Sequence, residues 1–211
     1  QPTGMVYSHY TIVFPFEQYS AFAALQSQGH EIWARFFGSS LEDRLRYTPS
    51  DCFETFPFPD DWETLQALED AGQSYYDYRA SLMLKNEEGL TQTYNRFHDR
   101  YNRDLVIERL RELHAMMDRA VLEAYGWGDI PTECDFFPEY EIDEEDEGKK
   151  KIPYRYRWPD EVRDEVLARL LELNAVRAKE EARIGTAAPK KRSRNVTPKA
   201  EPISPATERL F

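Results

Sequence analysis

The chain of 211 residues has little cysteine and no long apolar run. Its two cysteines, Cys52 and Cys134, are far apart and match no metal or redox spacing, which favours reduced thiols. No run approaches the ~18 apolar residues of a membrane span, and there is no signal-peptide pattern. We therefore expect a cytoplasmic protein with no membrane partner.

Cofactor and catalytic motifs are also missing. The only G-x-G, GWG at 126–128, follows a predicted helix, so we interpret it as a helix stop. No Pro-Pro pair is present, and hence no motif of the type that holds an extruded base. His9, His30, His98 and His114 lack i,i+4 spacing and nearby cysteine, which indicates core or surface roles. We expect no catalytic residue, cofactor or metal site within this chain.

Basic residues are in deficit. The chain has 27 Lys and Arg against 39 Asp and Glu, a net charge of -12, which argues against a general nucleic-acid binder. Acidic residues concentrate in 133–147, where no basic residue occurs, so we interpret 133–151 as an acidic linker. The basic run KKRSR at 190–194 is interpreted as part of a solvated tail.

The remaining patterns predict an α+β fold. Residues 5–16 are rich in β-branched and aromatic residues, typical of a strand that ends at Pro15. Helical spacing follows over 17–37, with a kink near Gly29 and an end at 38–40. We expect a small mixed sheet-and-helix portion over 1–60.

A mainly helical module is predicted over 61–184. Asp60 or Asp61 can cap its first helix, Asp104 the second, and Pro159 opens the third. The second helix should bury an apolar stripe from Leu105 to Ala124, and the third a stripe from Val162 to Val176. Residues 185–211 turn to Ala, Pro, Ser, Thr and Lys and are predicted to be a disordered tail.

A short mixed-charge segment, 41–47, alternates with period two and predicts a strand with Glu42, Arg44 and Arg46 on one face. Residues two apart on a strand face stand about 7 Å from each other, so two of them can address one base pair. Arg donates two hydrogen bonds to guanine, and Glu accepts one from the amine of cytosine. The alternative is a surface ion pair.

Four segments carry a resemblance to a known family: HEIWARFFGSSLEDRLRYTPSDCFETFPFP (30–59), GLTQTYNRFHD (89–99), LRELHAMMDRAVLEAYGW (110–127) and YRWPDEVRDEVLARLLELN, which ends at Asn174. Over roughly residues 1–180 the chain resembles the C-terminal part of type IIG/IIL-like DNA adenine methyltransferases. These enzymes serve restriction-modification or antiphage defence.

The resemblance implies that 1–60 is the C-terminal part of a DNA target-recognition domain and that a helical segment follows it. It also implies that the positions matching Glu42 and Arg44 read one base pair. We expect weaker contacts with the DNA backbone from four further residues: Ser39, Ser40, Arg46 and Tyr47.

The same resemblance places the missing motifs in an upstream domain. Because the sequence begins at Gln1 rather than Met, we expect a C-terminal piece of a longer methyltransferase. S-adenosylmethionine is expected in that upstream domain, and the expected partners are the upstream domain and double-stranded DNA. Whether this chain is itself an enzyme is left open.

A different class of function fits the same patterns. The helices could form a structural or interaction module that docks on the methyltransferase core or on defence partners without reading bases. A buried segment at 41–47 would favour this alternative, whereas an exposed one beside a basic cleft would favour DNA reading.

Overall fold

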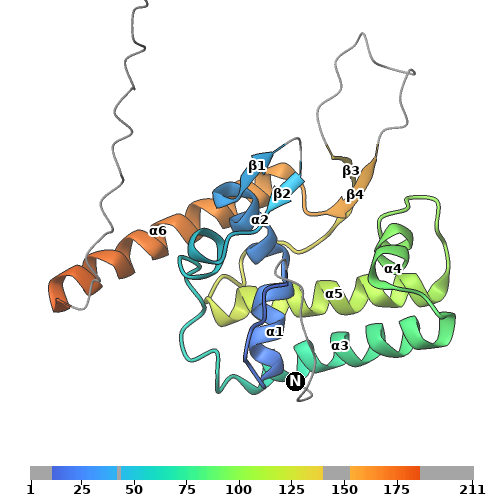
Figure 1. Cartoon of the computed structure of the whole chain (residues 1–211), viewed down its shortest axis with the longest axis horizontal. Helices are drawn as coiled ribbons and strands as arrows, with labels where there is room; N and C mark the ends of the chain where they lie inside the picture. Colours follow the sequence, from blue (N-terminus) through green and yellow to red (C-terminus); the bar gives the residue numbers. More distant parts are fainter. Residues whose placement is uncertain (1–10, 42–43, 140–152, 186–211) are drawn as a thin grey trace, which may run out of the picture.

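The computed structural model describes residues 11–41, 44–139 and 153–185. Its elements, in order, are α1 (Tyr19–Gln26), α2 (Gln28–Phe37), β1 (Ser39–Leu41), β2 (Arg44–Arg46), the π-helical turn η1 (Pro49–Phe53), α3 (Gln66–Asn86), α4 (Leu90–Phe97), α5 (Leu105–Ala124), β3 (Asp135–Pro138), β4 (Tyr154–Arg157) and α6 (Asp160–Ile184). Within the described residues, β1–β2 and β3–β4 form two separate antiparallel pairs (Figure 1). The predicted α+β class is confirmed, with helices in the majority.

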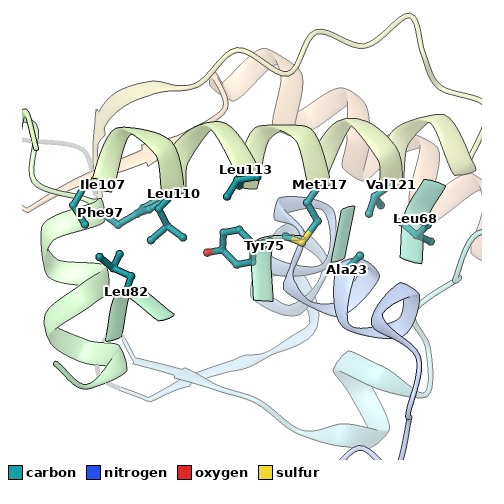
Figure 2. Packing of buried hydrophobic residues seen from close by; sticks show 10 residues of the cluster. All are labelled: Ala23, Leu68, Tyr75, Leu82, Phe97, Ile107, Leu110, Leu113, Met117 and Val121. Carbon is teal, nitrogen blue, oxygen red and sulfur yellow. The ribbon is translucent and has the colours of Figure 1, made fainter. Parts of the chain in front are cut away.

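Four helices, α1, α3, α4 and α5, build the first core. Figure 2 shows the apolar side chains of α5 directed toward Tyr75 of α3 and Ala23 of α1. The first core comprises Ala23, Leu68, Tyr75, Leu82, Phe97, Ile107, Leu110, Leu113, Met117 and Val121. Most of the predicted stripe of α5 is thus confirmed, but Leu105 is exposed because it is the first residue of the helix.

The helices α1 and α3 approach each other closely at Gly72. A Cβ atom at this position would lie 2.2 Å from the carbonyl oxygen of Tyr19, so only glycine fits without a shift of backbone. One turn earlier, the Glu69 carboxylate accepts a hydrogen bond of 2.6 Å from the backbone N–H of Ser20. This bond satisfies one of the free N–H groups at the start of α1. The start of α1 is therefore anchored on α3.

A second core joins α2, the end of α5 and α6. Its members are Ile32, Trp33, Phe56, Leu122, Ile130, Trp158, Val166 and Leu170. The indole Nε1 of Trp33 donates to Thr55 Oγ1 at 3.1 Å, which holds α2 to the segment after η1. Because both cores draw residues from each side of position 60, the predicted segments 1–60 and 61–184 pack together rather than forming separate cores.

The helix α6 begins where the sequence predicts, at Asp160 after Pro159, and ends at Ile184 before Gly185, whose φ is 75°. Its fully buried residues lie in its first half, while Asn174 and Arg177 farther along donate hydrogen bonds to the carbonyl oxygens of Thr55 and Phe58. Val166 and Leu170 are buried, whereas Val176 is exposed, so the predicted apolar stripe stops short of its expected end. In Figure 1 the C-terminal half of α6 extends away from the other helices. The tail predicted to be disordered, from 186 onward, lies outside the described residues.

Ser27, rather than Gly29, separates α1 from α2. Its backbone is extended, and its hydroxyl accepts a hydrogen bond of 3.3 Å from the N–H of His30, as an N-cap does. Gly29 lies inside α2. The predicted kink is therefore a helix boundary two residues earlier, since a serine that can cap ends one helix and starts another.

The predicted strand over 5–16 is wrong for its described part. Residues 11–18 form neither helix nor strand, and 1–10 lie outside the described residues. Phe14 packs against Phe53, with ring centroids 4.9 Å apart, and Phe16 packs edge-on against Trp62 at 5.6 Å. The aromatic residues that indicated a strand serve side-chain packing instead.

Two predictions about helix boundaries also need correction. α3 begins at Gln66, after the predicted caps Asp60 and Asp61, because Asp61 has a left-handed φ of 54° that does not lead into a helix. α4 was not predicted at all. With 8 residues, it is too short to show a clear helical period.

Part of the predicted acidic linker is a strand. Residues 135–138 form β3, which pairs with β4 so that Phe136 lies opposite Tyr156. The guanidinium of Arg111, on α5, lies 5.0 Å from the Phe136 ring and donates two hydrogen bonds to the carbonyl oxygen of Phe97. The β3–β4 pair is therefore attached to α5. Residues 140–151 of the linker lie outside the described residues.

Candidate nucleic-acid interface

The segment that carries the predicted base readers is a hairpin, not the single strand predicted for 41–47. β1 and β2 pair antiparallel, with Ser39 opposite Arg46 and Leu41 opposite Arg44. The chain reverses between Leu41 and Arg44, so the continuous strand face argued from the alternating pattern is not formed. The alternating sequence pattern does not end where the chain reverses, because charged residues are common in turns as well as on exposed strands. Glu42 itself lies outside the described residues.

The hairpin brings several predicted contact residues onto one ribbon. Ser39 and Ser40 belong to β1, and Arg44 and Arg46 belong to β2. Arg46 is exposed. Tyr47 is different: it follows β2 directly, is half-buried, and has a pKa raised to about 12 by burial. The structure thus assigns Tyr47 to the support of the hairpin.

An aromatic cluster forms that support. The Tyr47 hydroxyl lies 2.9 Å from Nε2 of His30, in hydrogen-bond contact, and its ring meets Phe14 edge-on at 6.3 Å. Phe53, the last residue of η1, packs against Phe58 with ring centroids 5.9 Å apart. The exit of the hairpin is therefore connected to α2 and to the proline-rich segment that enters the second core.

A cavity of about 260 Å³ lies next to Tyr47. Residues of α2, α5, β4 and the end of α4 meet around it. We call it the histidine cavity, because its lining includes three imidazoles and three phenols: His30, His98, His114, Tyr47, Tyr94 and Tyr156.

Two of these imidazoles are neutral at pH 7. Burial lowers the pKa of His30 to about 4, and burial together with the Arg155 guanidinium does the same for His98. The N–H of Tyr156 donates to Nδ1 of His98 at 3.1 Å, so Nε2 carries the proton of this ring. Nδ1 of His30 is buried without a hydrogen-bond partner among the described residues. Such a group costs about 1–3 kcal/mol.

The third imidazole, His114, is held by a buried carboxylate. Burial disfavours its charge, but Asp118, whose Oδ2 is 3.1 Å from Nδ1, raises the pKa of His114. Asp118 also accepts hydrogen bonds of 2.9 Å from the backbone N–H and the side-chain Nε2 of Gln28. Gln28 Oε1 in turn accepts from the N–H of Trp158 at 2.9 Å. This network joins α2, α5 and the residues before α6.

A smaller hollow of about 60 Å³ adjoins the histidine cavity. Four residues line both: Gln28, Glu31, His98 and Tyr156. We call the smaller hollow the arginine cleft, because its lining holds four guanidinium groups and two carboxylates: Arg35, Arg155, Arg157, Arg163, Glu31 and Glu139.

Ion pairs fix the guanidinium groups of the arginine cleft. Arg155 pairs with Glu139 at 2.9 Å. Asp160, which is not part of the lining, pairs with Arg157 at 2.7 Å and with Arg163 at 3.0 Å. With Asp160 counted, the four guanidinium groups still exceed the carboxylates by one charge. The cleft therefore favours a small anion.

Sequence reasoning missed this pair of hollows. His30, His98 and His114 lie on three separate elements, and no spacing connects them. A partial signal exists, because His114 and Asp118 are four residues apart on a predicted helix and so share a face. Within the described part of the chain, no three His, Cys, Asp or Glu side chains are grouped so that they could hold a metal ion.

No family model, curated protein or solved structure matches the chain. In the described ranges, no helix has the length and apolar character needed to cross a membrane.

Proposed function

We propose that the β1–β2 hairpin reads the target sequence of a site-specific DNA adenine methyltransferase of restriction-modification or phage defence, and that this chain is the C-terminal part of that enzyme. The hairpin is the observation that carries the proposal. A two-stranded ribbon fits the major groove of DNA, and this one has Arg44 and Arg46 in its second strand. The resemblance of 30–59 to the recognition domains of these enzymes supports the same role.

Within this proposal the residues have different tasks. Arg44 donates to a guanine, and Glu42 accepts from the paired cytosine. Arg46, Ser39 and Ser40 contact the sugar-phosphate backbone and so set the register of the protein on the duplex. Tyr47 is the weakest of the predicted contacts because its hydroxyl is engaged with His30.

The rest of the enzyme supplies what this chain lacks. S-adenosylmethionine and the catalytic motif belong to an upstream domain, and the complete enzyme acts on double-stranded DNA in the cytoplasm. With a net charge of -12, the chain alone neutralises few phosphates, so it should bind DNA weakly when isolated.

Methylation-site sequencing of the enzyme expressed from its complete gene tests the proposal. Arg44→Ala should relax preference at one base pair by about 1–3 kcal/mol, because a bidentate contact is lost. Arg46→Ala should lower methylation of all sites alike. The matched control is Arg109→Ala, an exposed arginine of α5 paired with Glu112, which should change neither. Equal behaviour of all three variants would reject base reading by the hairpin.

A second candidate is the interaction module, and one observation favours it. A hollow of about 520 Å³ lies between α3 and α5, and its lining combines alanines and the exposed Met116 with the charged residues Asp70, Arg119 and Glu123. In this case α3 and α5 dock on the methyltransferase core. Met116→Glu would then break the docking of α3 and α5 on the upstream domain, while Arg44→Ala would leave the methylated sequence unchanged.

A further inference from the structure

We infer that the histidine cavity and the arginine cleft together bind a nucleotide, with the base in the cavity and the phosphate in the cleft. The inference goes beyond the proposed function and does not depend on it, because neither hollow includes a residue of β1 or β2. The shared chemistry is that of a nucleoside monophosphate, either free or at the 5′ end of a single strand of DNA.

The base half of the site follows from the lining of the cavity. Planar rings from α2, α4 and β4 provide faces on which a heteroaromatic base can stack. His30 is only 5% exposed and lines the cavity, yet its Nδ1 has no partner among the described residues. The imidazole of His30 is one of the rings that a base in the cavity would contact.

The phosphate half follows from the arginine cleft. Guanidinium groups bind phosphate oxygens through paired N–H donors, and four of them line this small hollow. The volume of about 60 Å³ suits one compact anion rather than a chain of phosphates. Since His98 and Tyr156 line both hollows, a sugar in contact with these two residues would join a base on one side to a phosphate on the other.

Size and charge agree with a mononucleotide. Together the two volumes reach only the lower end of the range of about 300–1,000 Å³ that is typical of small-molecule sites, which excludes a dinucleotide cofactor. His30 and His98 are neutral at pH 7, so the cavity itself carries little positive charge. We therefore place the charged phosphate of the ligand in the arginine cleft and its uncharged base in the histidine cavity.

Isothermal titration calorimetry on the 211-residue chain tests the inference. The ligands are AMP, GMP, CMP and dTMP, with adenosine and inorganic phosphate for comparison. At least one monophosphate should bind, and loss of its phosphate should weaken binding roughly tenfold or more, because charge-assisted hydrogen bonds disappear. Failure of all four monophosphates to bind at millimolar concentration, with the chain folded by circular dichroism, would overturn it.

A pair of arginines on α6 supplies a matched control. Arg163 lines the cleft, whereas Arg169 pairs with Asp129 and Glu165 outside it, and both side chains are 28% exposed. Arg163→Gln should weaken the monophosphate roughly tenfold, and Arg169→Gln should leave its affinity unchanged. Equal affinities of the two variants would contradict a phosphate in the cleft.

The base half needs a readout that does not require a buried substitution. In ¹⁵N NMR spectra the Nδ1 signal of His30 should move when the monophosphate is added and stay in place with inorganic phosphate. If inorganic phosphate binds as tightly as the monophosphates, or if His30 does not respond, the nucleotide assignment is wrong and the cleft is an anion site only.

The two sources of the nucleotide are then separated by competition. Tighter binding of a 5′-phosphorylated single-stranded oligonucleotide than of the matching monophosphate assigns the site to a strand end, and the reverse order assigns it to a free nucleotide. Both outcomes support the inference. Displacement of the monophosphate by neither the oligonucleotide nor a second monophosphate would contradict a shared site.

Discussion

Two neighbouring stripes of α5 are built in different ways. One stripe places Leu110, Leu113 and Met117 in the first core, where apolar contacts of many kinds would serve. The next stripe places His114 and Asp118 in a buried polar network that needs one particular partner, Gln28 from a helix far away in the sequence. A buried polar group is stable only with its partner in place, so the second stripe should respond more sharply to single changes than the first.

The largest effect is expected at Asp118. Asp118→Ala removes the carboxylate beside a buried imidazole and leaves two donors of Gln28 unpaired, which should cost about 3–5 kcal/mol of unfolding free energy. Urea denaturation measures the loss. The matched control is Asp129→Ala, which removes a surface ion pair with Arg169 and should cost less than about 1 kcal/mol. Equal losses of unfolding free energy would mean that the buried network contributes no more to stability than the surface ion pair.

A change at the contact between two helices of the first core tests the packing of α1 against α3. Gly72→Ala forces a methyl group toward the Tyr19 carbonyl and should cost about 3 kcal/mol, since backbone must move. Thermal or urea unfolding measures this cost. Gly128→Ala is the control: a Cβ there meets no atom within 4 Å, so stability should stay within about 0.5 kcal/mol. If Gly72→Ala is as stable as the wild type, the two helices are not in close contact.

Lowering the pH should reduce the stability of the fold, because two imidazoles that line the histidine cavity are buried in the neutral form. His30 and His98 have pKa values of about 4 when folded and near 6.5 when unfolded, so the unfolded chain takes up protons first as the pH falls below 6.5. Their contribution to stability is complete above pH 6.5 and is lost toward pH 4. His114 acts in the opposite direction, because its folded pKa is raised. Two groups act in one direction and one in the other, so the unfolding free energy should fall between pH 7 and pH 5.

Urea unfolding at both pH values checks this sign. His98→Gln keeps an acceptor for the N–H of Tyr156 but does not titrate, so its loss between pH 7 and pH 5 should be smaller than that of the wild type. A chain that is equally stable at pH 5 and pH 7 would show that the imidazoles are not buried as described.

The smallest expected effect is a gain in stability on substitution of Gly29. Gly29 lies inside α2, and a Cβ there would stand 3.5 Å from Ser27 Oγ, an ordinary contact. Gly29→Ala should therefore stabilise the chain by about 0.5–1 kcal/mol, because alanine loses less conformational freedom in a helix. A higher melting temperature confirms it, and a lower one would indicate that the methyl group disturbs the cap at Ser27.

Much of the helical framework could be predicted from the sequence. The cap at Asp104, the stop at Gly126 and the start of α6 follow from local signals, and the structure has each of them. The stripe of α5 has the helical period, so its inward face could be predicted as well. Such features depend on residues within a few positions of one another.

The candidate sites depend on contacts that no local pattern contains. The chain reversal between Leu41 and Arg44 could not be predicted, because a strand and a hairpin can both show an alternation of charged and apolar residues. The histidine cavity could not be predicted either, because its three imidazoles come from elements that are far apart in the sequence. Local patterns indicated a core or surface role for each of them, and only the tertiary arrangement of α2, α5 and the end of α4 brings them together.

The central claim, base reading by the hairpin, is tested most directly by exchanging its charges in the complete methyltransferase. Glu42→Lys together with Arg44→Asp inverts donor and acceptor, so the preferred base pair at one position should change from C·G to G·C while the rest of the site is kept. Each single variant should methylate less well than the double, because it leaves like charges facing one base pair. Identical methylated sequences for the wild type, both singles and the double would contradict the account.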